Sequence, residues 1–175
     1  MNKVFLTVIK SMILIVIGWG SVNTLAFSQE QKSEAHDGHE VGGMEVGLSV
    51  GYVYLKEDKE SGINFHLHVM KRLSGEGLQK YLSIGLGAET IISKEKHYSA
   101  MVTLGVHPWR NLVFSVSPGM EWAEHDGKWE SEYATHFEAT YVFEGANFHY
   151  GPVVGYSKAR DEQHYTIGVH FGMPF

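Results

Sequence analysis

The chain has 175 residues, with 14 lysines and arginines against 20 aspartates and glutamates, and its formal net charge is -6 at pH 7. This acidic balance argues against a nucleic-acid partner, which would require a basic face. The absence of cysteine excludes disulfides, thiolate metal sites and the lipid-modified N-terminal cysteine of a lipoprotein.

The first residues predict a secretory signal. Lys3 and Lys10 supply positive charge, and an apolar run spans 12–19. The small residues Ala26 and Ser28 then stand two positions apart, as signal peptidase requires. We therefore expect a signal peptide over 1–28, cleaved near Ser28. A retained membrane anchor is the alternative, but the run is shorter than the roughly 20 apolar residues that a spanning helix needs.

Residues 29–42 are polar and lack periodicity, so we expect a flexible leader in the periplasm. The leader contains His36 and His39 within the tract HDGHE, which has the composition of a short metal-binding segment. A solvated tail without a metal is the simpler interpretation of the same residues.

From residue 43 to residue 175, apolar residues alternate with small or polar ones. A period of two residues predicts strands with one apolar face. The expected strands are 44–54, 63–69, 82–89, 98–106, 112–122, 133–143, 148–156 and 164–175. Pro118 lies on the apolar face of the fifth strand, where it predicts a local bulge or bend because proline cannot donate a ladder hydrogen bond.

The last strand is apolar at every second position and ends on Phe175. This resembles the C-terminal strand of the small eight-stranded outer-membrane β-barrel proteins of Gram-negative bacteria, and the resemblance covers 43–175. It implies an all-β, antiparallel, up-and-down transmembrane barrel in the outer membrane, monomeric and with both termini in the periplasm. It also implies contact with outer-membrane lipid and lipopolysaccharide, and recognition of Phe175 by the barrel-assembly machinery. It carries no named activity.

A soluble eight-stranded barrel, such as a lipocalin, shares the period but hides its apolar residues inside. Here the other face carries small and polar residues that suit a narrow interior, and the aromatic residues gather toward the strand ends, as in the girdles of membrane barrels. The charged connections also alternate with connections of lower charge. These observations favour the membrane barrel. The expected girdle residues are Tyr52, Tyr54, Tyr98, Trp122, Tyr133, Tyr156, Tyr165, Phe171 and Phe175.

The chain is rich in histidine, with 11 residues, and the alternation points several of them into the lumen. His136, His149 and His170 lie on consecutive strands, and closure of the barrel brings the second strand near them. Imidazole and carboxylate ligands suit Zn²⁺, Ni²⁺ or Cu²⁺. The simpler interpretation is a structural plug of hydrogen-bonded His–Glu pairs, without a cofactor. The candidate metal ligands are His66, His68, His136, Glu138, His149 and His170, with His36 and His39 of the leader, and Glu45, Glu89 and Glu121 share the inward face.

A lipid A-modifying enzyme is a further alternative. A deacylase of this kind needs an outward-facing histidine and serine. No histidine of the expected strands falls on the apolar, outward face of the alternation, which we call outward parity. An acyltransferase could use His125, Asp126 and Ser131 in one loop, although this spacing has little specificity. A general porin would need roughly 16–18 strands. The sequence therefore predicts no catalytic residue and a structural or interaction role in the envelope, with metal binding as the alternative.

Overall fold

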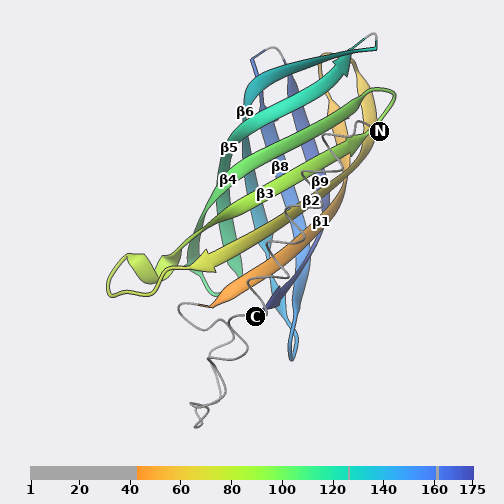
Figure 1. Cartoon of the computed structure of the whole chain (residues 1–175). Helices are drawn as coiled ribbons and strands as arrows, with labels where there is room; N and C mark the ends of the chain where they lie inside the picture. Colours follow the sequence, from red (N-terminus) through yellow and green to blue (C-terminus); the bar gives the residue numbers. More distant parts are fainter. Residues whose placement is uncertain (1–42, 126, 161) are drawn as a thin grey trace. The chain divides into compact units, whose positions relative to one another are not determined.

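The computed structural model describes residues 43–125, 127–160 and 162–175, which form a closed antiparallel barrel (Figure 1). Its elements are β1 (Met44–Leu55), β2 (Glu60–Arg72), the 3-10 helix η1 (Gln79–Tyr81), β3 (Leu82–Ile92), β4 (Lys96–Trp109), β5 (Leu112–His125), β6 (Lys128–Tyr141), β7 (Phe143–Glu144), β8 (His149–Lys158) and β9 (Gln163–Pro174). From β1 to β6 each strand pairs with the next one in sequence, β8 pairs with β9, and β1 pairs with β9 to close the ring. Because β7 continues β6 and both pair with β8, the barrel has the eight strands that the sequence predicts.

Within these residues, no helix is long and apolar enough to cross a membrane.

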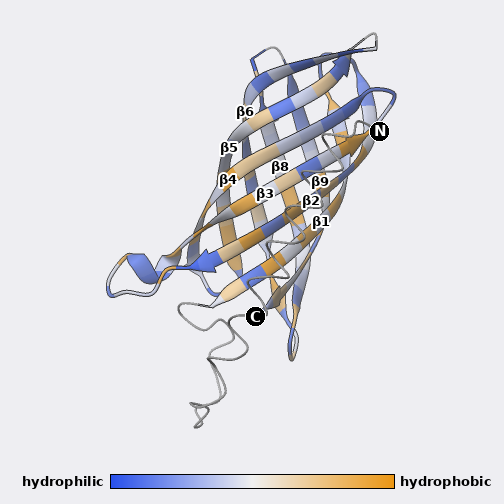
Figure 2. Cartoon of the chain, viewed as in Figure 1, coloured by the Kyte–Doolittle hydropathy of each residue, from blue (hydrophilic) through white to orange (hydrophobic). Residues whose placement is uncertain are grey.

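The predicted alternation of faces is confirmed on the strands. On β3, Leu86 is 56% exposed, whereas Ser83 is 5% and Glu89 is 7% exposed. Figure 2 shows apolar and polar residues alternating along the ribbons. Exposed aliphatic side chains around buried polar ones are the reverse of the usual arrangement in a soluble protein. The small and polar face therefore lines the lumen.

The strands run between two ends of the barrel. We call the end that carries Gly43 and Phe175 the terminal end, and the connections 73–81, 110–111 and 145–148 lie there. The β1–β2, β3–β4, β5–β6 and β8–β9 connections lie at the other end, which we call the loop end. The connection 73–81 is longer than the turn expected over 74–77. Leu73 N donates a hydrogen bond of 2.9 Å to Leu82 O at its base, and η1 lies within it.

Pro118 interrupts the ladder without shifting it. Neither Pro118 nor Ser117 pairs with β4, but the register is the same on both sides of them, and the irregularity lies between Val106 and Trp109. Pro118 is therefore not the site of a bulge. In the lumen, Ser117 Oγ donates a hydrogen bond of 3.0 Å to Thr103 Oγ1 across the interrupted stretch. This side-chain bond joins β4 and β5 where the ladder is incomplete.

The lumen also holds apolar residues that the sequence interpretation left out. Val53, Leu55 and Ile91 form a buried cluster near the loop end, and they are 0–3% exposed. Their side chains share the inward parity of β1 and β3, next to the polar residues. The interior is therefore filled by an apolar group as well as by histidines and glutamates.

Aromatic side chains gather on the outer face near both ends. At the loop end, Tyr98 stacks on Trp129 with ring centroids 5.5 Å apart, and Tyr156 lies 5.3 Å from Tyr165. At the terminal end, Tyr150 lies within 6.1 Å of both Phe143 and Phe148. The girdle residues expected from the sequence that are more than a third exposed are Tyr52, Tyr54, Trp122, Tyr133, Tyr165, Phe171 and Phe175, while Tyr98 and Tyr156 are half-buried by their stacking partners.

Candidate functional site

The lumen contains the candidate ligands that the alternation placed there. His66, His136, His149 and His170 are 1–4% exposed. The side chain of His68 is 12% exposed. The inward orientation of these histidines follows from strand parity alone, since every second side chain of a strand faces the same side of the sheet. His36, His39 and Asp126 lie outside the described residues, as do the predicted signal peptide and leader over 1–42.

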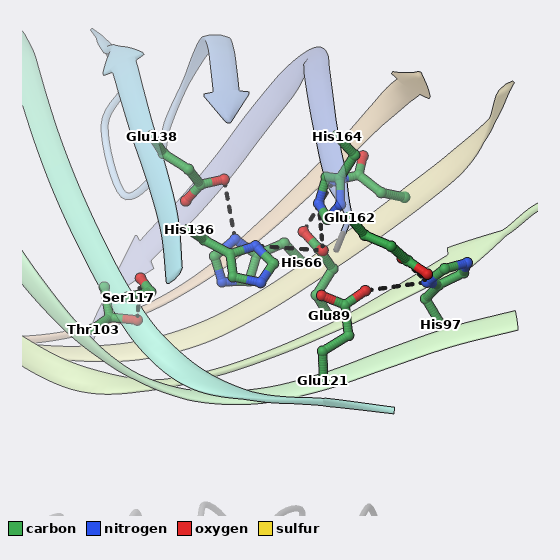
Figure 3. Close-up of polar contacts among 11 residues, drawn as sticks. His66, Glu89, His97, Thr103, Ser117, Glu121, His136, Glu138, Glu162 and His164 are labelled. Atoms are coloured by element: carbon green, nitrogen blue, oxygen red, sulfur yellow. Dashed lines mark hydrogen bonds and ion pairs between the residues drawn. The ribbon is translucent and has the colours of Figure 1, made fainter. Parts of the chain in front are cut away.

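Three levels of histidine and glutamate occupy the lumen between the two ends. We call them the loop-end cluster, the central cluster and the terminal cluster. Each brings together residues from at least three strands or connections, so none could form before the barrel closes. The close-up in Figure 3 shows the loop-end and central clusters.

The loop-end cluster is formed by His97 of β4, Glu121 of β5 and Glu162 of the β8–β9 connection. His97 Nδ1 lies 3.1 Å from Glu121 Oε1 and 3.5 Å from Glu162 Oε2 (Figure 3). The side chains of His97 and Glu121 are each 1% exposed. One imidazole therefore faces two carboxylates in a dry site, where an ion pair or a charge-assisted hydrogen bond is stronger than in water.

The central cluster is formed by Glu89 of β3, His136 of β6 and His164 of β9. Glu89 Oε1 lies 3.4 Å from His164 Nε2 and 3.6 Å from His136 Nδ1 (Figure 3). The other oxygen, Glu89 Oε2, accepts a bond of 3.3 Å from Asn64 Nδ2. A cavity of about 10 Å³ beside these residues has the volume that one water molecule requires.

A His–Glu pair lies next to the central cluster. His66 Nδ1 of β2 lies 3.1 Å from Glu138 Oε1 of β6, across the width of the barrel (Figure 3). His66 Nε2 and His136 Nε2 make no hydrogen bond within the described residues. A buried polar atom without a partner is costly, and these two nitrogens share that condition with Asn64 Oδ1 of the same network.

The terminal cluster is formed by Glu45 of β1, His68 of β2, His149 of β8 and His170 of β9. Glu45 Oε1 lies 3.3 Å from His149 Nε2, 3.7 Å from His68 Nε2 and 3.9 Å from His170 Nε2. The Nε2 atoms of His149 and His170 lie 3.2 Å apart. Three imidazoles therefore direct the same ring nitrogen toward one carboxylate oxygen.

The expected grouping of His136 with His149 and His170 is wrong. His136 pairs with Ser157, which in turn pairs with His164, so these residues lie at one level. His164 and His170 are six residues apart on β9, which corresponds to about 20 Å along a strand. Parity fixes the face of a residue, but its height depends on the register and tilt of the strands.

Three lumenal histidines were missed by the sequence interpretation. His97 and His164 immediately precede Tyr98 and Tyr165, which face outward, so parity could have placed both of them in the lumen. His107 continues the inward face of β4 and lies 3.0 Å from Ser83 Oγ through Nε2. The sequence did not indicate Glu162, because a residue in a connection has no alternation of faces and its position in the lumen depends on the folded barrel.

Each of the three clusters could hold a divalent cation. Within each, the ligand atoms of Glu45, His149 and His170, of Glu89, His136 and His164, and of His97, Glu121 and Glu162 lie within 4.8 Å of one another. Imidazole and carboxylate ligands suit Zn²⁺ and its neighbours in the transition series. The same groups also satisfy one another as a hydrogen-bonded plug. The clusters differ in how many nitrogen atoms they direct toward one point, and the terminal cluster directs the most.

The suggested acyltransferase constellation of His125, Asp126 and Ser131 is not tested by the structure. Asp126 lies outside the described residues, and the side chain of His125 is not described either. Ser131 pairs with Trp122 on the outer face at the loop end.

Solved structures with a similar fold are small membrane barrels. Neisserial surface protein A is 9% identical, with 81% of this chain aligned to 100% of that one and a TM-score of 0.55. Ail, the attachment invasion locus protein of Yersinia pestis, is 16% identical over 77% of this chain and 99% of that chain, with a TM-score of 0.51. A barrel from a study titled "De novo design of transmembrane beta-barrels" is 17% identical over 78% of this chain and 100% of that chain, also at 0.51.

No family model and no curated protein sequence matches this chain. At the identities above, the likeness to the solved structures establishes the fold.

Proposed function

We propose that this protein is an integral outer-membrane barrel with a closed lumen, and that it has a structural or interaction role in the envelope without enzymatic activity. The observation that carries the proposal is the combination of an apolar outer surface with an interior filled by side chains. Outward residues such as Leu86, Val154 and Ile167 are 52–62% exposed and surround the barrel. A surface of this kind is unfavourable in water and favourable against lipid.

The closed lumen follows from the contents of the interior. The apolar cluster of Val53, Leu55 and Ile91 lies beside the loop-end and central clusters, because Ile91 pairs with His97 and Leu55 pairs with His164. The terminal cluster fills the lumen toward the terminal end. An eight-stranded barrel is only wide enough for its own side chains. We therefore infer that the protein does not conduct ions as a general porin does.

The orientation is part of this proposal. Both ends of the described barrel, Gly43 and Phe175, lie at the terminal end, which we assign to the periplasm. The loop end, with its charged connections, then faces the outside. Outer-membrane lipid and lipopolysaccharide are the partners of the apolar face, and a single copy of the barrel completes every strand pairing.

The absence of enzymatic activity is supported by the position of the histidines. In the described residues, each strand histidine with a described side chain is buried or bonded toward the lumen, away from lipid. A lipid-hydrolysing site would need such a group on the outer face. Lipid A from cells that express the protein should have the same mass spectrum as lipid A from cells with an empty vector.

The test of the closed lumen is conductance of the refolded chain in planar bilayers. Insertion is verified first by heat-modifiable migration on a gel, which reports the folded barrel. We expect folded protein in the bilayer without stepwise conductance. Regular conductance steps from heat-modifiable protein would contradict the closed lumen, and failure of the protein to insert would contradict the membrane location.

A further inference from the structure

We propose that the terminal cluster is a binding site for one divalent transition-metal ion of the zinc class. Glu45, His149 and His170 supply three ligands, and His68 supplies the fourth. The site goes beyond the structural role proposed above, because a closed barrel needs no metal. The site is supported by the spacing of the ligand atoms, by a serine that holds one imidazole and by two glycines that make room for the rings.

The spacing of the ligand atoms is that of a tetrahedral site. Zinc bonds of about 2.0–2.1 Å in tetrahedral geometry place neighbouring ligand atoms about 3.3 Å apart. His149 Nε2 lies 3.2 Å from His170 Nε2 and 3.3 Å from Glu45 Oε1. The distances from Glu45 Oε1 to His68 Nε2 and His170 Nε2, 3.7 and 3.9 Å, are a few tenths of an ångström longer. The ligand atoms of Glu45, His149 and His170 therefore lie close to the spacing of three ligands of one ion. His68 Nε2, 3.7 Å from Glu45 Oε1, is placed to join them as the fourth ligand by rotation of its side chain.

The kind of metal follows from the ligand atoms. Three imidazole nitrogens and one carboxylate oxygen suit Zn²⁺ and the neighbouring Co²⁺, Ni²⁺ and Cu²⁺. Mg²⁺ and Ca²⁺ prefer sites made entirely of oxygen ligands, whereas this cluster offers a single carboxylate among three imidazoles. In a hydrogen bond between His149 Nε2 and His170 Nε2, one nitrogen donates and the other accepts. A divalent ion would instead accept a lone pair from each of the two nitrogens.

Ser49 fixes the orientation of one ligand. Ser49 Oγ lies 3.1 Å from His170 Nδ1 and is itself buried. When His170 Nδ1 donates its proton to this hydroxyl, the lone pair of Nε2 points toward Glu45. Metal-binding histidines are commonly held by such a bond from the other ring nitrogen.

Two glycines on the β1–β9 seam make the space for the ligands. Gly47 and Gly172 are paired across the seam, Gly47 also pairs with His68, and Gly172 also pairs with His149. A Cβ atom at Gly172 would overlap the His149 ring, and one at Gly47 would overlap His68 and lie 2.6 Å from His170 Cε1. The imidazoles therefore occupy the volume that ordinary side chains would fill.

The terminal cluster is also the most accessible cluster from the terminal end of the lumen. The side chain of Glu45 is 21% exposed and that of His68 is 12% exposed, whereas those of His149 and His170 are each 5% exposed. An ion entering from the terminal end meets the carboxylate first and the two deep imidazoles next. The central cluster, by contrast, is buried on all sides.

The test uses Co²⁺, because tetrahedral Co²⁺ absorbs visible light much more strongly than the hydrated ion. The full chain carrying His36→Ala and His39→Ala, which removes the leader histidines, is refolded in detergent and titrated. We expect saturation at one equivalent with the tetrahedral absorption band, and loss of the band when Zn²⁺ is added. His149→Ala and His170→Ala should each abolish the band.

His136→Ala is the matched control, because it removes a lumenal histidine of the central cluster. The proposal requires the band to be unchanged in this variant. A band that disappears in His136→Ala, or that persists in His149→Ala, would place the metal elsewhere and overturn the proposal. Absence of any tetrahedral band in the folded parent chain would overturn it as well.

Folding is followed in each variant by heat-modifiable migration. If the ligand variants fail to fold, X-ray absorption of the zinc-loaded parent chain gives the answer without them. We expect a shell of nitrogen and oxygen atoms that includes three imidazoles. A shell with fewer than three imidazoles would contradict the proposed ligand set. The conductance test of the closed lumen is independent of both results.

Discussion

His149 Nε2 and His170 Nε2 lie 3.2 Å apart on neighbouring strands, and both face the carboxylate of Glu45. Neither histidine is close to the other in sequence, and the pairing of β8 with β9 brings them together at the terminal end. Gly172, opposite His149, and Gly47, across the seam, leave room for the two rings. Glu45 and Gly47 of β1 join the two histidines only through the β1–β9 pairing that closes the barrel.

Ser49→Ala tests the support of His170. The substitution removes the hydroxyl that holds His170 Nδ1, and loss of such a partner commonly weakens metal affinity by about 10–100-fold. Competition between Co²⁺ and a chelator of known affinity measures the change. Ser157→Ala is the matched control, because Ser157 is equally buried but its hydroxyl makes no hydrogen bond within the described residues. Equal affinities in the two variants would show that Ser49 does not orient a ligand.

His97→Ala tests the loop-end cluster. Removing the imidazole leaves Glu121 and Glu162 facing a dry site without their shared partner, and breaking a buried ion pair costs about 3–5 kcal/mol. The free energy of unfolding, from urea titration in lipid vesicles, measures the loss. Adding Glu121→Gln to His97→Ala should recover part of it, because one of the two carboxylates is neutralised. A cost below 1 kcal/mol for His97→Ala would contradict the interaction.

Gly168→Ala tests the closing seam of the barrel. A Cβ atom at Gly168 would lie 2.6 Å from Gly51 Cα and would overlap Val50 O, and both are backbone atoms that cannot rotate away. Overpacking of this kind costs about 1–3 kcal/mol. Gly155→Ala is the matched control, since a Cβ atom there makes ordinary contacts of 3.4 Å or more. Urea titration should show a loss only for Gly168→Ala, and equal stabilities would contradict the tight seam.

Epitope insertion tests the proposed orientation. A tag inserted in the connection 159–162 lies at the loop end, and a tag between Arg110 and Asn111 lies at the terminal end. We expect antibody to label intact cells through the first tag and to reach the second only after the outer membrane is opened. The reverse pattern would place the terminal end outside the cell.

The faces of the strands were predictable from the sequence, whereas the heights of the lumenal residues were not. Alternation alone assigned Leu86 to the outside and Glu89 to the lumen, because side chains of a strand point to opposite faces in turn. The separation of His136 from His149 depends instead on the register of β6, β8 and β9. Register depends on contacts around the whole ring, so no single strand encodes it.

The connections were the least predictable part of the fold. The turn expected over 74–77 is part of a longer connection that contains η1, and Gly77 adopts a positive φ of 68° within it. The contribution of Glu162 to the loop-end cluster was also hidden, because a residue outside a strand has no parity. Together with the missed His97, this makes the loop-end cluster the part of the candidate site that the sequence indicated least.

The most direct test of the central claim, that the outer face of the barrel contacts lipid, is the depth dependence of an arginine substitution. Leu86 and Ile92 face outward on the same strand and are 56% and 58% exposed, but Leu86 is mid-strand and Ile92 is at the loop end. We expect Leu86→Arg to lower the free energy of unfolding in vesicles by about 2–4 kcal/mol and Ile92→Arg by about 0–1 kcal/mol. Equal, small losses of less than about 0.5 kcal/mol at both positions, as for a water-exposed surface, would contradict the membrane barrel.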